Sequence, residues 1–122
     1  MYQGDVFAEL GEALFWLGAL ADATKRREPL LNGLQWARNR VAHGHLVAAP
    51  VAYEPGAGLG HLVLGRSRLG TASKLRWSPE SSVPSIPRKY RDARQDADYR
   101  GHVEGREVMP VLRDVLHLLT VP

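Results

Sequence analysis

The residues best suited to chemistry in this sequence lie between positions 38 and 43. Arg38 and Asn39 are followed by His43 within the stretch Arg-Asn-Arg-Val-Ala-His. Histidine titrates near neutral pH and can remove or return a proton, while arginine can hold the oxygens of a phosphate. Asparagine could orient either group by a hydrogen bond. These residue types suit metal-free cleavage of RNA, in which the ribose 2′-hydroxyl attacks the adjacent phosphorus, and DNA lacks that hydroxyl.

The same segment resembles the hallmark motif of the HEPN family, the higher eukaryote and prokaryote nucleotide-binding domains. That motif is an arginine, often followed by a polar residue, and then a histidine after four to six positions, and Arg38-Asn39-x-x-x-His43 matches it. The resemblance implies a small helical bundle that dimerises and a metal-independent ribonuclease with no cofactor. It implies that Arg38, Asn39 and His43 are catalytic. It also implies that the domain could be a toxin or an antiphage effector, with an antitoxin or a nucleotidyltransferase-like protein as its partner. Other members are inactive, so a domain that binds RNA, a nucleotide or a protein is the alternative.

Helix geometry restricts how such a site can be built. Arg38 and His43 are five residues apart, a rotation of about 140° on a helix, so they cannot share one face. Asn39 and His43, four residues apart, nearly coincide. Either the helix unwinds at His43, beside Gly44, or two copies of the motif meet across a two-fold axis. The second arrangement predicts a homodimer whose separated monomers are inactive.

Apolar residues at helical spacing predict the elements that position this segment. Residues 5–23 form a first helix, with the stripe Val6, Leu10, Leu14, Leu17 and Leu20. A second helix begins near Pro29, which the first helical turn tolerates, and ends near His43 or Gly44. A last helix covers residues from about Glu107 to Leu119. We therefore predict a mainly α fold, an antiparallel helical bundle.

Between the second and the last helix, about residues 46–103 form an insertion with a different pattern. Residues 46–53 and 61–64 flank a glycine-rich turn and predict a β-hairpin, and residues 74–77 predict another short strand. The whole chain, residues 1–122, is then a single domain with a β-hairpin-containing insertion.

The rest of the insertion has a polar composition. Residues 79–87 are rich in proline and serine and are predicted to form a surface loop without regular structure. Residues 88–100 are highly charged, and their pattern fits either a polar helix or a mobile segment.

Positive charge is concentrated in the same insertion. The chain has 16 Lys and Arg against 13 Asp and Glu, and the segment from Arg66 to Arg100 alone has nine basic and four acidic residues. Such a segment suits RNA, because phosphate contacts supply most of the sequence-independent affinity, although an ordinary solvated loop would have a similar composition. Together with the motif, it gives the predicted RNA-binding residues Arg40, His45, Arg66, Arg68, Arg76, Arg88, Lys89 and Arg91.

Structural roles are open for the same residue types. His43 and His45 could satisfy carbonyl groups at a helix C-terminus, and Arg38 and Arg40 could be surface charges. A metal site at His43 and His45 is disfavoured, because no nearby carboxylate completes a ligand set. Aromatic residues of the first two helices are expected in the core or at a dimer interface: Phe7, Phe15, Trp16 and Trp36. Those of the basic region could stack on bases: Trp77, Tyr90 and Tyr99.

Composition excludes several classes of protein. The chain has no cysteine, so it has no disulfides, thiolate zinc sites or cysteine nucleophiles. No run approaches the roughly 20 apolar residues that cross a bilayer, and the N-terminus has no secretory signal pattern. We expect no association with membranes and a cytoplasmic location.

Overall fold

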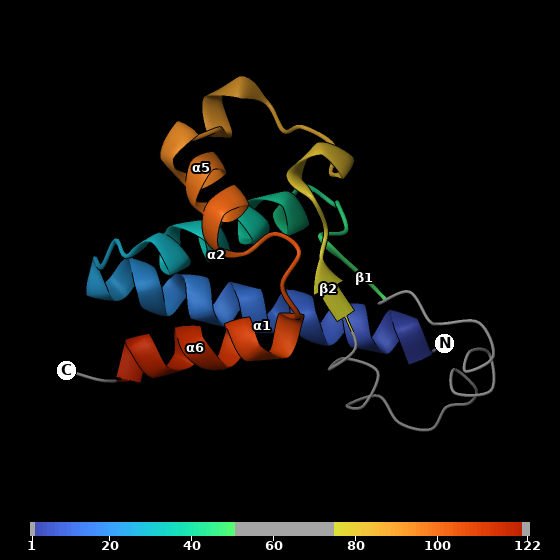
Figure 1. Cartoon of the computed structure of the whole chain (residues 1–122), viewed down its shortest axis with the longest axis horizontal. Helices are drawn as coiled ribbons and strands as arrows, with labels where there is room; N and C mark the ends of the chain where they lie inside the picture. The colour runs from blue at the N-terminus through green and yellow to red at the C-terminus, as the bar shows by residue number, and fades with distance from the viewer. Residues whose placement is uncertain (1, 51–74, 121–122) are drawn as a thin grey trace.

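The computed structural model describes residues 2–50 and 75–120. In chain order these residues form the elements α1 (Tyr2–Thr24), α2 (Pro29–Ala42), β1 (Ala48–Pro50), β2 (Leu75–Trp77), the short 3-10 helices η2 (Glu80–Ser82) and η3 (Arg88–Tyr90), α5 (Ala93–His102) and α6 (Val108–Thr120). Figure 1 shows α1 between α2 and α6, with α5 lying across α2 on the side away from α1. The described part is therefore mainly helical, as predicted, with one helix more than the three expected.

Helix α2 begins and ends where its local residues favour a boundary. Pro29 is its first residue, and the chain leaves it through Gly44, whose φ of 85° is readily adopted only by glycine. The amide of Gly44 donates to the carbonyl of Val41, and the amide of His45 donates to that of Arg40. These two bonds form a Schellman cap, so the predicted end of this helix is confirmed.

One part of the core lies between α1, α2 and α6, and the same cluster of buried residues continues to α5 and the two strands. Buried apolar side chains from the three helices meet there, among them Leu10, Leu14, Leu34, Ala37, Val111 and Val115. The predicted apolar stripe of α1 is not buried at its C-terminal end, where Leu20 is about half exposed. Phe15 and Trp16 of α1 are also exposed, so they do not lie in the core of this chain, and their alternative place at a dimer interface stays a prediction.

Helix α5 is the polar helix that the sequence left undecided. Asp92 caps it, because its side chain accepts hydrogen bonds from two backbone amides of the first turn. It packs closely on α2: a Cβ added to Gly33 would lie 2.6 Å from a methyl carbon of Val103. Asn32 of α2 also donates to Asp98 of α5 over 2.9 Å. Contacts with α2 therefore stabilise a helix that lacks an apolar stripe of its own.

The two described strands pair antiparallel, with Ala48 opposite Trp77 and Pro50 opposite Leu75. The prediction of a strand near residues 74–77 is confirmed for Leu75–Trp77. The proposed second strand of the hairpin, residues 61–64, lies outside the described residues. The prediction for residues 79–87 is wrong in part, because they include the helical turn η2, and Val83 and Ile86 are buried.

Candidate functional site

The predicted histidine lies just beyond the last turn of α2. His43 is exposed, and its Nδ1 lies 2.9 Å from the carbonyl oxygen of Asn39. Because a carbonyl oxygen only accepts, Nδ1 carries the proton in this contact, and the neutral ring then has its lone pair on Nε2. The ring centroid of His43 is 5.1 Å from that of Tyr90. One nitrogen is thus oriented by the backbone, and the other is left to act as a base.

Arg38 has different neighbours from His43. Its Nη1 lies 3.4 Å from a carboxylate oxygen of Asp22 in α1. Asn39 points toward α5, where its side-chain nitrogen donates to Gln95 over 3.1 Å. Within one chain, the structure therefore does not bring Arg38 and His43 to a common point.

Arg40 is buried in the same helix. It is 4% exposed, and its guanidinium carbon lies 4.2 Å from the centroid of the Trp36 ring. Its Nη2 lies 3.6 Å from Asp96 in α5, and Tyr99 stacks on Trp36 with the ring centroids 3.8 Å apart. Burial lowers the pKa of Arg40, and the negative charges of Asp96 and Glu80 oppose this shift. Arg40, predicted to bind RNA or to be a surface charge, is thus buried in the packing between α2 and α5 and is not at the surface.

A pocket of about 320 Å³ lies beside this arginine. Its lining includes Trp36, Arg40, Glu80, Ser85, Arg91 and Asp96. Several of its polar atoms are buried and have no hydrogen-bond partner in the described part of the chain: Arg40 Nε and Nη1, Trp36 Nε1 and Asp96 Oδ1. The pocket and these buried polar atoms without hydrogen-bond partners together define a second candidate site.

This second site could not be located from the sequence alone. One signal was available, because Trp36 and Arg40 are four residues apart and so lie on one face of α2. The carboxylate partner of Arg40 could not be predicted from spacing, because Asp96 reaches Arg40 only through the packing of α5 on α2.

One group of predicted RNA-binding residues is exposed around η3. Arg88 and Lys89 belong to this turn, and Arg91 follows it. The ammonium of Lys89 lies 5.1 Å from the ring centroid of Tyr90, which in turn contacts His43. This cationic turn is therefore adjacent to the exposed imidazole at the end of α2.

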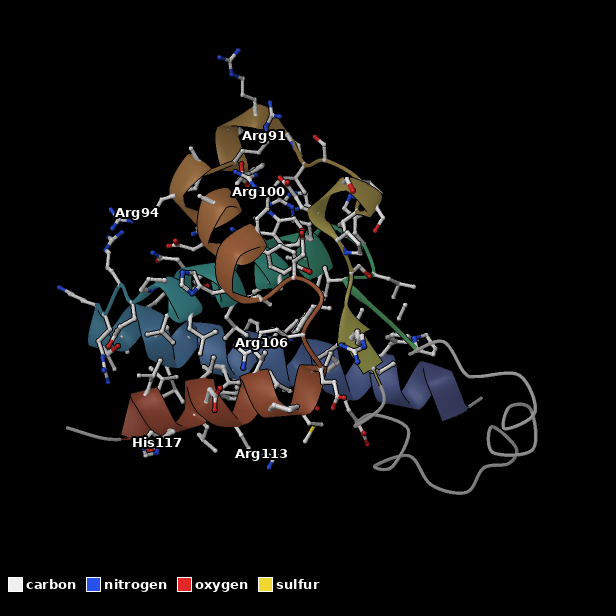
Figure 2. All side chains as sticks on the ribbon, in the orientation of Figure 1. Arg91, Arg94, Arg100, Arg106, Arg113 and His117 are labelled. Carbon is white, nitrogen blue, oxygen red and sulfur yellow. The ribbon has the colours of Figure 1, made fainter. Side chains whose placement is uncertain are left out.

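Arg76, a further predicted RNA-binding residue, does not lie with this turn. Arg76 lies in β2, where it donates to the carbonyl of Gly105, and Figure 1 shows β2 well separated from η3. Arg66 and Arg68 lie outside the described residues. Figure 2 shows Arg91, Arg94 and Arg100 around α5, whereas Arg106, Arg113 and His117 lie along α6. The described basic residues therefore do not form one continuous surface.

Burial also decides which aromatic residues could meet a base. Trp77 and Tyr99 are almost completely buried, so the prediction that they stack on bases is wrong. Trp36 is buried, as expected for a core residue, whereas Tyr90 is 49% exposed. Of the three candidates in the basic region, Tyr90 alone has an accessible ring.

Residues 2–50 and 75–120 contain neither a cluster of metal-binding side chains nor a helix able to span a membrane. No group of three or more His, Asp or Glu side chains in these ranges could hold a metal ion. None of the helices in the same ranges combines the length and apolarity that a bilayer span requires.

Fold and site together define a mainly helical chain with a small antiparallel sheet, an oriented surface histidine and a pocket around a buried arginine. Comparison of the chain with protein-family models, with curated proteins and with solved structures gives no match. The case for a function therefore depends on the chemistry of these residues.

Proposed function

We propose that this chain is a HEPN-like endoribonuclease, a homodimeric helical bundle that cleaves RNA without a metal ion. The observation that carries the proposal is the orientation of the exposed His43 side chain, whose Nδ1 donates to the carbonyl of Asn39, so that Nε2 keeps its lone pair for proton transfer. A general base needs such an orienting hydrogen bond. Arg38 would stabilise the negative charge that develops on the phosphate oxygens. The product would carry a 2′,3′-cyclic phosphate.

The second protomer is needed to complete this site. Arg38 contacts α1 while His43 contacts Tyr90, so the two groups do not meet within this chain, whereas a two-fold axis would bring Arg38 of one protomer to His43 of the other. The surface of α1 beside Arg38 suits a contact between protomers. Phe15 precedes Asp22, the partner of Arg38, by seven residues, about two helical turns, and so lies on nearly the same face of α1. Phe15 and Trp16 are each 60% exposed, and aromatic side chains are enriched in interfaces.

Cleavage of a labelled single-stranded RNA in the presence of a chelator tests the proposal. We expect His43→Ala to lower the rate by about 100-fold or more, the range for loss of a general acid or base. His117→Ala is the matched control, because His117 is also exposed but lies in α6, and it should leave the rate unchanged. A wild-type protein that does not cut RNA, or an His43→Ala variant as active as wild type, would refute the catalytic role.

A mixing experiment tests the shared site. Arg38→Ala and His43→Ala should each be inactive, yet a heterodimer of the two variants has one intact pair of groups. Random exchange in an equal mixture should therefore restore about one quarter of the wild-type rate. If both variants are inactive and their mixture stays inactive after subunit exchange, Arg38 and His43 do not act across the interface.

A second candidate is a catalytically silent domain of the same type that binds RNA. The exposed cations of η3 beside Tyr90 favour it, because they form a surface on which a base could stack and a phosphate could bind. Binding without cleavage, weakened steeply by salt and by Lys89→Gln, would support this candidate. Under either candidate, an antitoxin or nucleotidyltransferase-like partner would be expected to cover His43.

A further inference from the structure

The pocket beside Arg40 has the features of a binding site distinct from His43. Arg40 is 4% exposed, and its Nε and Nη1 lack hydrogen-bond partners among the described residues. A guanidinium does not lose its proton in proteins, so these buried donors stay charged. Because an unpaired buried donor is costly, the arrangement favours a partner group in the pocket.

Packing between α2 and α5 explains only part of this arginine. The guanidinium stacks on Trp36, and its Nη2 faces Asp96. Neither contact engages Nε or Nη1. A water molecule takes about 30 Å³, roughly a tenth of the pocket volume. The pocket is instead at the lower end of the range of small-molecule sites, about 300–1,000 Å³.

The unpartnered polar atoms specify the kind of ligand. Arg40 Nε, Arg40 Nη1 and Trp36 Nε1 are donors, whereas Asp96 Oδ1, which makes no hydrogen bond but lies 3.6 Å from Arg40 Nη2, is an acceptor. The hydroxyl of Ser85, also in the lining, can do either. A fitting ligand therefore has several acceptor oxygens and one O–H donor. A phosphate group that retains a proton has this pattern, whereas sulfate at neutral pH has acceptors only.

The charges around the pocket allow an anion to bind. Glu80, one of the lining residues, is paired with Arg100 over 3.0 Å. The negative charge of Asp96 is offset by the guanidinium of Arg40. Arg91 adds a second arginine to the lining, so that together with Arg100 three arginines offset the two carboxylates.

We propose that this pocket binds a phosphate group that retains one proton, either inorganic phosphate or the terminal phosphate of a nucleotide. The proposal does not depend on the ribonuclease proposal, because a phosphodiester within RNA carries no proton to donate to Asp96. If an experiment refutes one of the two proposals, the other is therefore not affected.

Isothermal titration calorimetry of the full chain tests the pocket. We expect inorganic phosphate to bind at least about tenfold more tightly than sulfate at equal ionic strength, because a hydrogen bond to a charged group is lost with sulfate. A dinucleoside monophosphate, which has only an internal phosphodiester, should not bind. Tighter binding of adenosine 5′-monophosphate than of inorganic phosphate would identify a nucleotide as the source of the group, and the reverse would identify the free ion.

Variants assign the effect to the pocket. Asp96→Asn replaces the charged acceptor by an amide that can donate, so sulfate should bind more tightly and the preference for phosphate should disappear. Arg91→Gln should weaken both anions. Arg113→Gln is the control, because Arg113 is exposed on α6, away from the pocket (Figure 2), and both affinities should stay unchanged.

Three results would overturn the proposal, and the first two need no variant. Equal affinity for phosphate and sulfate would show that Asp96 does not select the ligand. The absence of binding at millimolar concentrations of either anion would show that the pocket holds only water. A preference for phosphate that persists in Asp96→Asn would remove the role assigned to this carboxylate.

Discussion

Substitution of Gly33 by alanine is a direct test of the packing that forms the Arg40 pocket. Helices α2 and α5 approach closely at this residue. A Cβ there would lie 2.6 Å from Val103 Cγ2 and 3.3 Å from both the Asp98 carbonyl oxygen and the Tyr99 Cα. Non-bonded carbon atoms prefer about 3.5–4.0 Å. The added methyl group must therefore shift Val103 or separate α5 from α2.

Two effects of opposite sign determine the size of the change. Replacing glycine by alanine inside a helix stabilises a protein by about 1 kcal/mol when nothing is in the way. Adding a methyl group to a well-packed core costs about 1–3 kcal/mol. Two of the three contacts at Gly33 involve backbone atoms of α5, which cannot rotate away. The cost should thus fall in the upper part of that range, and we expect a net destabilisation of about 1–2 kcal/mol.

Urea unfolding followed by circular dichroism measures this change, and the chain offers a matched control. Gly101 is in α5, and a Cβ added to it would meet no atom within 4 Å. Gly101→Ala should therefore stabilise the protein slightly, by up to about 1 kcal/mol. The two alanine variants are expected to change stability in opposite directions. A Gly33→Ala protein as stable as the wild type would refute the close packing of α2 on α5.

Three further predictions concern single groups, each measured as the free energy of unfolding. Tyr99 is a buried phenol whose pKa is raised by burial, and its hydroxyl donates to the Ser78 carbonyl over 2.5 Å. Tyr99→Phe should therefore lower the free energy of unfolding by about 1–2 kcal/mol. Tyr90→Phe, at an exposed position, should leave it almost unchanged. Asp92→Ala removes the N-cap of α5 and should cost about 1 kcal/mol, and no loss would mean that the cap is dispensable. Lys25 has a φ of 60°; Lys25→Gly should stabilise by about 1 kcal/mol, and a loss of stability would contradict the inferred strain.

The helices that could be predicted from the sequence are those with local signals. The first helix, predicted over residues 5–23, covers Tyr2–Thr24 in the structure. The second helix ends at its glycine cap, as predicted. The last helix, predicted from about Glu107, begins at Val108. Helix α5 lacks an apolar stripe, and it is held by polar contacts with α2 such as that between Asn32 and Asp98. Contacts of this kind arise only from the tertiary fold, so periodicity could not decide between a helix and a mobile segment.

The sheet and the pocket depend even more on distant parts of the chain. Alternating apolar residues identify a strand but not its partner, and Ala48–Pro50 pairs with Leu75–Trp77 far along the sequence. Trp36 and Arg40 could be placed on one face of a helix from their spacing. Their enclosure by Glu80 and Asp96 could not be predicted, because it requires η2 and α5 to be in position.

The geometry of α2 explains why its motif does not form a site within one chain. Consecutive residues of a helix are rotated by about 100°, so Arg38, Asn39 and Arg40 must face different neighbours. In the structure these neighbours are Asp22 of α1 for Arg38, α5 for Asn39, and the pocket for Arg40. Under the proposed function, a phosphate at His43 would meet Arg38 of another protomer, whereas a phosphate bound in the pocket would meet Arg40 of the same chain. If both proposals hold, separated monomers should lose RNA cleavage and keep phosphate binding.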